Sequence, residues 1–152
     1  MTTVLVLQGP NLNLLGSREP EIYGRATLAE IHAGIATQAA ELGLLVDFFQ
    51  SNHEGALIDR VQRKDFDVAI VNAGGLTHTS VSLRDALKGI GRPFVEVHIS
   101  DPGEREEFRR VNYLHDIAAQ RIVGMGAAGY TMALELIASR VGAKGTGKEP
   151  TR

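Results

Sequence analysis

Short apolar segments and longer amphipathic segments alternate along the whole chain. The apolar segments, rich in β-branched residues, cover residues 3–8, 44–50, 66–72, 93–100 and 121–125. They run as continuous apolar stretches, which is typical of strands covered on both faces of a sheet. Segments with a helical period separate them at residues 27–42, 54–64, 80–88 and 130–141, with a broken helical region over residues 104–120.

This alternation predicts an α/β fold. Five strands, each followed by a helix, imply an open parallel sheet with right-handed crossovers and helices on both faces. Ligands of such sheets bind beyond the carboxyl ends of the strands. We expect one domain over residues 1–141 and a flexible tail over residues 142–152, which have little apolar content.

Length and composition narrow the class of protein. The chain has 152 residues and a formal net charge of −2, which argues against nucleic-acid binding through bulk electrostatics. Cysteine is absent, so disulfides, thiolate nucleophiles and Cys-ligated metals are excluded. No apolar run reaches the roughly 20 residues that span a bilayer, and the start of the chain lacks a signal-like segment. We therefore expect a cytoplasmic protein with no membrane or nucleic-acid partner.

The connection after the first predicted strand is long and polar. It covers residues 9–26, whereas βα loops usually have about two to six residues. A long loop at the ligand-binding end of a central strand favours a functional lid. This loop holds Arg18 and Tyr23. The tyrosine ring could be a hydrophobic anchor for the loop, or its hydroxyl could act as a base.

A tyrosine base must meet an energetic condition. A phenol with the ordinary pKa of about 10 is ionised in about one molecule in a thousand at pH 7, a deficit of roughly 4 kcal/mol. One arginine about 4 Å away, at an effective dielectric constant near 20, offers up to about 4 kcal/mol. Arg18 lies in the same loop, and Arg109 could approach from another segment. The arithmetic permits a phenolate base, and the hydrophobic anchor stays open as the alternative.

Polar side chains share one face of the fourth predicted strand. Glu96, His98 and Ser100 fall at alternate positions, so they point to the same side. Polar groups at the end of a buried strand are costly unless they are satisfied. One interpretation is a structural carboxylate–imidazole pair, and the other is that Glu96 orients His98 for proton transfer. The place of the pair at the ligand-binding end favours proton transfer.

Two further polar segments follow predicted strands. Residues 72–80 read NAGGLTHTS, in which Asn72 and His78 add more polarity than a turn with a helix cap requires. Residues 104–110 read EREEFRR, most simply a solvated, salt-bridged helix face. Arg105 and Arg109 are four residues apart, however, so on a helix both would point the same way and could meet one anion.

Other motifs do not indicate a cofactor. Residues 124–129 read GMGAAG, a literal G-x-G-x-x-G, but only one helix and the tail follow, so the second strand and acidic residue of a dinucleotide site have no place. We interpret these glycines as allowing a tight turn and close helix–sheet packing, and we reject NAD binding. The five histidines form no metal-binding pair.

Together, these motifs resemble the type II 3-dehydroquinate dehydratase (type II dehydroquinase) family of the shikimate route to aromatic amino acids. The matching segments are GPNLNLLG (9–16), REPEIYG (18–24), QSNHEG (50–55), NAGGLTHTS (72–80), EVHIS (96–100) and REEFR (105–109). The similarity extends from about residue 4 to residue 141. The resemblance implies a flavodoxin-like three-layer sandwich with strand order 2-1-3-4-5, a dodecamer built as four trimers, and no cofactor.

The resemblance also implies a reaction, the loss of water from 3-dehydroquinate to give 3-dehydroshikimate by anti elimination through an enolate. Tyr23 matches the base, and Arg18 matches the lid arginine that stabilises the phenolate. His98 matches the acid that protonates the departing hydroxyl, with Glu96 behind it. Asn11 matches the asparagine that holds a water against the enolate oxygen.

The other matched positions bind the substrate. They are Asn72, Gly74, His78, Asp85, Ile99, Ser100, Arg105 and Arg109. Among them, the backbone amides of Ile99 and Ser100 match a clamp on the substrate carboxylate. Asp85 matches an acidic residue that reaches the site from a neighbouring subunit, so the resemblance ties oligomerisation to activity.

One alternative is a non-catalytic flavodoxin-like module that binds a mononucleotide, or a receiver-like domain. A receiver would need aspartates clustered at strand ends, whereas Asp47 and Asp67 lie near strand beginnings. No lysine lies at a strand end, which disfavours the Schiff-base chemistry of the other dehydroquinase class.

One departure from the family pattern is Asp101, where many relatives have asparagine. Its carboxylate would weaken the binding of an anion if it pointed inward.

Overall fold

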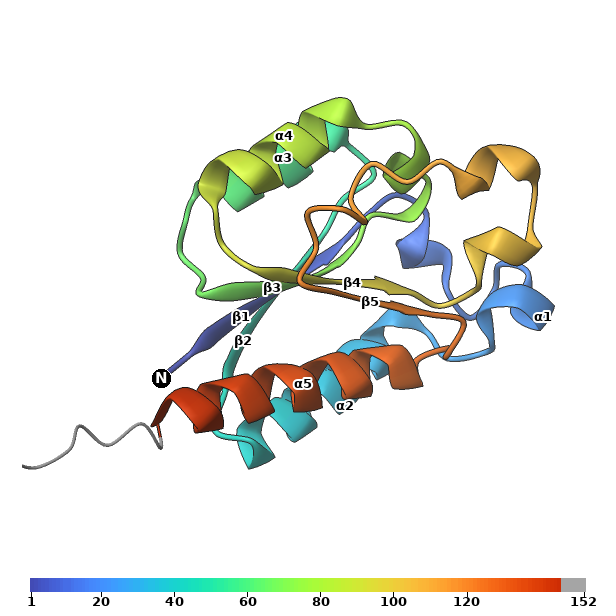
Figure 1. Ribbon diagram of the computed structural model, residues 1–152. Helices are drawn as coiled ribbons and strands as arrows, with labels where there is room; N and C mark the ends of the chain where they lie inside the picture. The colour runs from blue at the N-terminus through green and yellow to red at the C-terminus, as the bar shows by residue number, and fades with distance from the viewer. Residues whose placement is uncertain (146–152) are drawn as a thin grey trace, which may run out of the picture.

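A five-stranded parallel sheet forms the centre of the computed structural model, which describes residues 1–145 (Figure 1). The strands are β1 (Thr3–Gln8), β2 (Leu45–Gln50), β3 (Val68–Asn72), β4 (Phe94–His98) and β5 (Gln120–Val123). Neighbouring strands are all parallel, and their order is β2-β1-β3-β4-β5. The predicted α/β fold and strand order are confirmed.

Helices cover both faces of this sheet, which gives three layers. The long helices are α2 (Leu28–Glu41) and α5 (Ala128–Gly145) on one face, and α3 (Glu54–Gln62) and α4 (Val81–Ile90) on the other (Figure 1). The start of α2 is capped by the Thr27 hydroxyl, which accepts the Glu30 N–H at 3.2 Å. The Ser80 hydroxyl caps α4 in the same way, accepting the Leu83 N–H at 2.9 Å.

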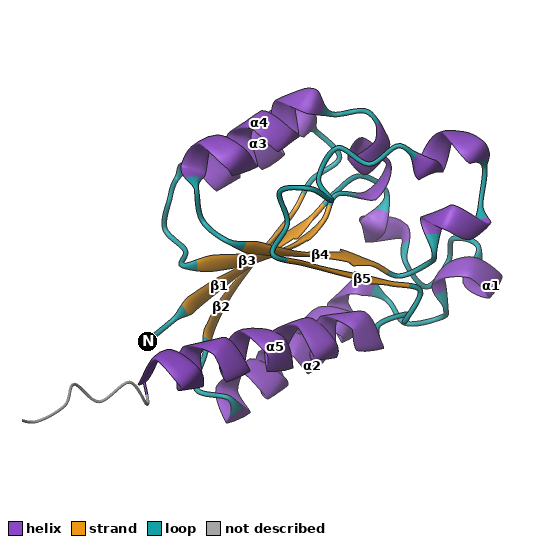
Figure 2. Ribbon diagram, viewed as in Figure 1, coloured by secondary structure: helices purple, strands orange, loops and turns teal. Residues whose placement is uncertain are grey.

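Several short elements gather beyond the carboxyl ends of the strands, at the right of Figure 2. They are η1 (Leu12–Leu14), α1 (Pro20–Tyr23), η2 (Gly74–His78), η3 (Pro102–Glu104) and η4 (Glu107–Arg110), where η marks a 3-10 helix. Gly9 allows the first of them to start close to β3, because a Cβ at this position would lie 2.3 Å from the Ala73 carbonyl oxygen.

The continuous apolar runs of the strands reflect two hydrophobic cores, one on each face of the sheet. Val4 and Val6 of β1 face the core under α2 and α5. Leu5 and Leu7, the alternate residues, face the core under α3 and α4. Because both sets are fully buried, neither face of β1 is open to solvent. None of the described helices is long and apolar enough to cross a membrane.

The glycine segment after β5 forms a turn, as interpreted from the sequence. Gly124 and Gly126 have φ angles of 72° and 60°, a conformation that residues with a side chain rarely adopt. A Cβ at Gly129 would lie 3.2 Å from the Val97 side chain, so this glycine lets α5 pack closely on the sheet.

The structure corrects two predicted boundaries. The expected helical region over residues 104–120 is wrong beyond η4, where the chain is irregular up to β5. There the Asn112 side chain accepts the N–H groups of Leu114 and His115, a local pattern that competes with a helix. Helix α5 continues to Gly145, so residues 142–145 of the expected tail are helical. The rest of that tail lies outside the described residues.

Candidate active site

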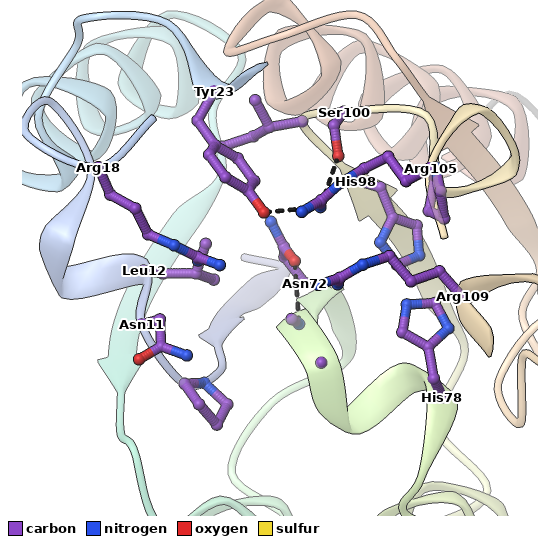
Figure 3. Close-up of a pocket in the computed structure, with 15 residues that line it drawn as sticks. Asn11, Leu12, Arg18, Tyr23, Asn72, His78, His98, Ser100, Arg105 and Arg109 are labelled. Carbon is purple, nitrogen blue, oxygen red and sulfur yellow. Dashed lines mark hydrogen bonds between the residues drawn. The ribbon is translucent and has the colours of Figure 1, made fainter. Parts of the chain in front are cut away.

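A cavity of about 110 Å³ lies at the carboxyl ends of the strands, where the sequence predicts a ligand site (Figure 3). All of the predicted site residues except two line it: Asn11, Arg18, Tyr23, Asn72, Gly74, His78, His98, Ile99, Ser100, Arg105 and Arg109. The two exceptions are Glu96, which lies behind His98, and Asp85, which is exposed on α4. Five separate segments of the sequence therefore converge on one cavity.

Tyr23 ends the short helix α1, and its side chain has two kinds of contact. The ring packs against the core under α2, as the anchor interpretation expects. Its hydroxyl accepts a hydrogen bond of 2.7 Å from Nη1 of Arg105. The guanidinium of Arg18 lies 4.7 Å from the ring centroid, and that of Arg105 lies 5.3 Å away. The ring is thus an anchor and the hydroxyl is still placed for chemistry.

The identity of the cation at the phenolic oxygen differs from the expectation. The sequence assigned this place to Arg18, with Arg109 as a second candidate. In the structure, Arg105 donates to the hydroxyl, whereas Arg18 lies over the face of the ring. Figure 3 shows Arg18 approaching from the side opposite Arg105 and Arg109. The tyrosine therefore lies between two guanidinium groups that come from different segments.

The basis on which Arg105 and Arg109 were paired is also wrong. They do not share an α-helix, because η3 ends before Arg105 and the 3-10 helix η4 contains Arg109. Glu106 holds them together instead, since its Oε2 accepts from Arg109 Nε at 2.5 Å and lies 3.9 Å from Arg105 Nε. A backbone hydrogen bond, followed by the bond from Arg109, keeps the pKa of Glu106 below its ordinary value.

His98 and Glu96 form a buried pair at the end of β4. Oε2 of Glu96 lies 2.5 Å from Nε2 of His98 and also accepts from Asn112 Nδ2 at 2.6 Å. Burial alone would raise the pKa of Glu96. The bonds from His98 and Asn112 and the charge of Arg121, 3.7 Å away, outweigh burial, so the pKa lies below its ordinary value. Glu96 is thus an ionised partner for the imidazole.

The Nδ1 atoms of the two histidines have different environments. Among the described residues, Nδ1 of His98 has no hydrogen-bond partner, and the ring lines the cavity. Nδ1 of His78 lies 2.6 Å from the Val111 carbonyl oxygen, which can only accept, so this nitrogen carries the proton. Burial is the main cause that lowers the pKa of His78. His78 therefore presents a neutral ring, with Nε2 available to the cavity.

Comparisons with known proteins agree with this geometry. The family described as "Dehydroquinase class II" matches residues 2–138. The chain belongs to this family. A "3-dehydroquinate dehydratase" from Janthinobacterium sp. (strain Marseille) is 54% identical over 134 residues, covering 86% of this chain and 92% of the relative. The "Catabolic 3-dehydroquinase 1" of Neosartorya fischeri is 51% identical and covers 90% of this chain and 92% of its own.

Solved structures of class II dehydroquinases have the same fold. The type II dehydroquinase from Butyrivibrio crossotus DSM 2876 superimposes with a TM-score of 0.87 at 39% identity, covering 90% of this chain and 97% of that one. The resemblance found from the sequence motifs is thus confirmed, as is the flavodoxin-like sandwich. The alternative of a non-catalytic mononucleotide-binding module is not favoured.

Asp101, the departure from the family pattern of the dehydroquinases, has a local structural role. Its Oδ1 accepts the Gly103 N–H at 2.9 Å and caps η3. The residue is not among those that line the cavity. The expected penalty for an inward carboxylate therefore does not arise in this conformation.

Four residues that contact the active site from behind were not identified from the sequence. They are Asn52, Asn112, Arg121 and Tyr130. Asn52 accepts the N–H of Asn11 at 2.9 Å and so holds the start of the lid, where Asn11 has a φ of 69°. Asn52 lies in the QSNHEG segment, whose match to the family was the available signal. The other three lie outside every matched segment.

Proposed function

We propose that this chain removes water from 3-dehydroquinate to give 3-dehydroshikimate, with Tyr23 as base and His98 as acid. The observation that carries the proposal is the placement of these two groups in one cavity. The Tyr23 hydroxyl is bonded to Arg105, and His98 is backed by the ionised Glu96. A guanidinium favours the phenolate, and a carboxylate favours a charged imidazole, so each residue has the partner that its role requires.

The proposed elimination has two proton transfers. Tyr23, as the phenolate, takes a proton from the carbon next to the ketone, and an enolate forms. The C–O bond to the neighbouring hydroxyl then breaks as His98 donates a proton, so that water leaves and the conjugated enone remains. A water held by Asn11 donates to the enolate oxygen, as the resemblance implies. No metal or redox step is part of this scheme.

The remaining lining residues would hold the substrate. Arg18, Arg105 and Arg109 make the cavity suitable for an anionic ligand. The backbone amides of Ile99 and Ser100 would bind the substrate carboxylate. His78 and Arg109 would contact the ring hydroxyls, with Asn72 and Gly74 beside the leaving group.

We also propose that the active protein is a dodecamer of four trimers in the cytoplasm. The resemblance supports this assembly, together with the position of Asp85, which is exposed on α4 and outside the cavity of its own chain. An Asp85 side chain from a neighbouring subunit would complete the site. Sedimentation of the purified protein tests the assembly, and cell fractionation tests the location.

A continuous ultraviolet assay tests the reaction through the absorbance of the conjugated enone. We expect turnover of 3-dehydroquinate without added metal or nucleotide, and no inactivation by borohydride in the presence of substrate. Tyr23→Phe should lower kcat by about 10³-fold with the fold unchanged, because acid–base groups contribute about 10² to 10⁴. His98→Ala should be similarly damaging. Near-normal turnover of either variant would refute its assignment, and an inactive wild-type protein would refute the reaction.

A further inference from the structure

A series of side-chain hydrogen bonds runs from the cavity into the core. Nδ2 of Asn72 donates to the Tyr130 hydroxyl at 2.9 Å, and this hydroxyl donates to Oε1 of Gln8 at 2.8 Å. Nε2 of Gln8 lies 3.4 Å from Nε2 of His32. Asn72, Tyr130 and Gln8 are 4%, 1% and 0% exposed. They come from β3, α5 and β1, and of the three only Asn72 lines the cavity.

The donor or acceptor character of each hydrogen-bond partner allows a single hydrogen-bond direction at each group of the series. The Gly74 N–H can only donate, so it takes Oδ1 of Asn72, 3.2 Å away, and Nδ2 must face Tyr130. The Tyr130 hydroxyl accepts a hydrogen bond from Asn72 and donates one to Gln8. The amide nitrogen of Gln8 then faces His32, which must accept. A flip of the Asn72 amide would place its oxygen against Tyr130 and its nitrogen against the Gly74 N–H.

The protonation states of the two titratable groups in the series, Tyr130 and His32, are consistent with this order. Burial raises the pKa of Tyr130 to about 12, so its hydroxyl keeps the proton that it donates to Gln8. Burial lowers the pKa of His32, which favours the neutral ring that can accept from Gln8. His32 is further held by stacking on Phe48, with ring centroids 4.3 Å apart. The series therefore orients side chains and is not a path for a proton.

We propose that Tyr130 is a positioning residue that fixes the direction in which Asn72 presents its amide to the substrate, with Gln8 holding the Tyr130 hydroxyl. This inference rests on the proposed contact between Asn72 and the substrate. One Nδ2 hydrogen of Asn72 is used by Tyr130 and one Oδ1 lone pair by Gly74, which leaves the other hydrogen and lone pair for the ligand. Because a partner already holds the Asn72 amide on each side, substrate binding does not have to order it, and that loss of conformational entropy is avoided.

The test is a double-mutant cycle with Tyr130→Phe and Asn72→Ala. Tyr130→Phe removes a single oxygen and keeps the ring in the core. It should lower kcat/KM about fivefold to tenfold, mostly through KM, because Asn72 is a binding contact. In the Asn72→Ala background the same change should lower kcat/KM less than twofold, since the residue it positions is absent. A purely structural role would lower the melting temperature in both backgrounds and leave KM unchanged.

Two control variants separate positioning from stability. Tyr113→Phe makes the same chemical change at a half-buried tyrosine whose hydroxyl has no hydrogen-bond partner in residues 1–145, and it should keep the kcat/KM of the wild type. Ile35→Val removes a methylene from the core that contains Tyr130, and it should lower the melting temperature with kcat/KM unchanged.

The outcomes distinguish this inference from the function on which it rests. Normal kcat/KM in Tyr130→Phe, or an equal fall with and without Asn72, would overturn the positioning role. Full activity of Asn72→Ala would instead overturn the substrate contact of Asn72 itself. If Tyr130→Phe does not fold, Gln8→Leu removes the acceptor of the Tyr130 hydroxyl. It should give a fall of about twofold to fivefold that Asn72→Ala again abolishes, and additivity would refute the inference.

Discussion

The two sides of the cavity are built in different ways. The strand-end wall, which we define as Asn72, Glu96 and His98, is buried, and each side chain has a hydrogen-bond partner within the described chain. The lid, residues 9–26, carries Arg18 and Tyr23, which are only partly buried. The Arg18 guanidinium lies over the face of the Tyr23 ring, and Arg105, which donates to the Tyr23 hydroxyl, belongs to another segment.

This difference separates a preorganised side from an adaptable one. The carboxylate behind His98 is fixed by neighbours on β-strands and by Asn112, and the amide of Asn72 by Tyr130 of α5, so they need little rearrangement when the substrate binds. The lid includes two non-glycine residues with positive φ, Asn11 at 69° and Glu19 at 38°, and such conformations cost about 1 to 2 kcal/mol each. We infer that the acid side is set by folding, whereas the base side is completed by contacts across the cavity.

Among variants that keep both Tyr23 and His98, the largest expected effect comes from breaking those contacts across the cavity. Arg105→Ala should lower kcat about 10²-fold, because the oxygen of the proposed base loses its charged hydrogen-bond donor. Arg18→Ala should have an effect of the same kind. Steady-state kinetics of both variants at one pH, at saturating and limiting substrate, measures the two effects.

The matched control is Arg110→Ala, which removes an exposed guanidinium next to Arg109 that does not line the cavity. It should keep the wild-type kcat. If Arg105→Ala leaves kcat unchanged, while Arg18→Ala lowers it, then the hydrogen bond from Arg105 to Tyr23 does not support the proposed base. The assignment made from the sequence alone would then be the better one.

The strand-end wall was more predictable from sequence than the partners of the lid. The wall residues follow from two local rules. Alternation along β4 places Glu96 and His98 on one face, and the carboxyl ends of parallel strands meet at one edge. The fold class also follows, because each apolar run and each helical period depends on nearby residues, whereas the strand order was implied by the resemblance to the dehydroquinases. Arg105 and Arg109 do line one cavity, but the helical spacing expected for them is absent because η3 ends at Glu104 and η4 begins at Glu107.

Contacts between distant segments explain what was missed. Tyr130 reaches Asn72 across 58 positions of sequence, and Arg105 reaches Tyr23 across 82. Neither pair has a spacing that any local pattern could indicate. The sequence does contain these residues, but only the tertiary structure, with α5 packed on the sheet and Arg105 beside Tyr23 of the lid, determines which of them meet.

A smaller effect is expected from changing the strand-end wall without removing its acid. Glu96→Gln should lower kcat about tenfold with KM nearly unchanged, because one amide oxygen must serve both His98 and Asn112, and the charge is lost. The control Asp101→Asn makes the same change at a carboxylate outside the cavity and should keep full kcat. An unaffected kcat in Glu96→Gln would show that His98 needs no ionised partner.

The stability of the Glu96→Gln variant against acid is a second test of the ionised carboxylate. The pKa of Glu96 is lowered in the folded state from a reference value of 4.5, so its contribution to stability is present above that pH and is lost as the pH falls through the folded value. Urea unfolding between pH 5 and pH 3 should therefore show a shallower loss of stability in Glu96→Gln than in the wild type. Equal slopes would contradict the lowered pKa.

The smallest expected effect lies at the far end of the hydrogen bonds behind Asn72. Burial lowers the pKa of His32 from 6.5, so the unfolded chain takes up a proton that the folded ring resists. The resulting stability is present above about pH 6.5 and is lost as the pH falls below it. His32→Gln keeps an acceptor for Gln8 and removes the titration. It should reduce the loss of unfolding free energy between pH 6.5 and 5.5 by at most about 0.5 kcal/mol, since the half-exposed ring is screened by solvent.

Urea titrations at several pH values measure this difference, with His115→Gln as the control at an exposed histidine. The control should keep the wild-type slope. If His32→Gln also keeps this slope, protonation of His32 does not affect stability over this pH range, and Gln8 is held by Tyr130 alone. If His32→Gln flattens the slope and leaves kcat/KM unchanged, the orientation of Asn72 depends on the acceptor at this position and not on the imidazole that normally provides it.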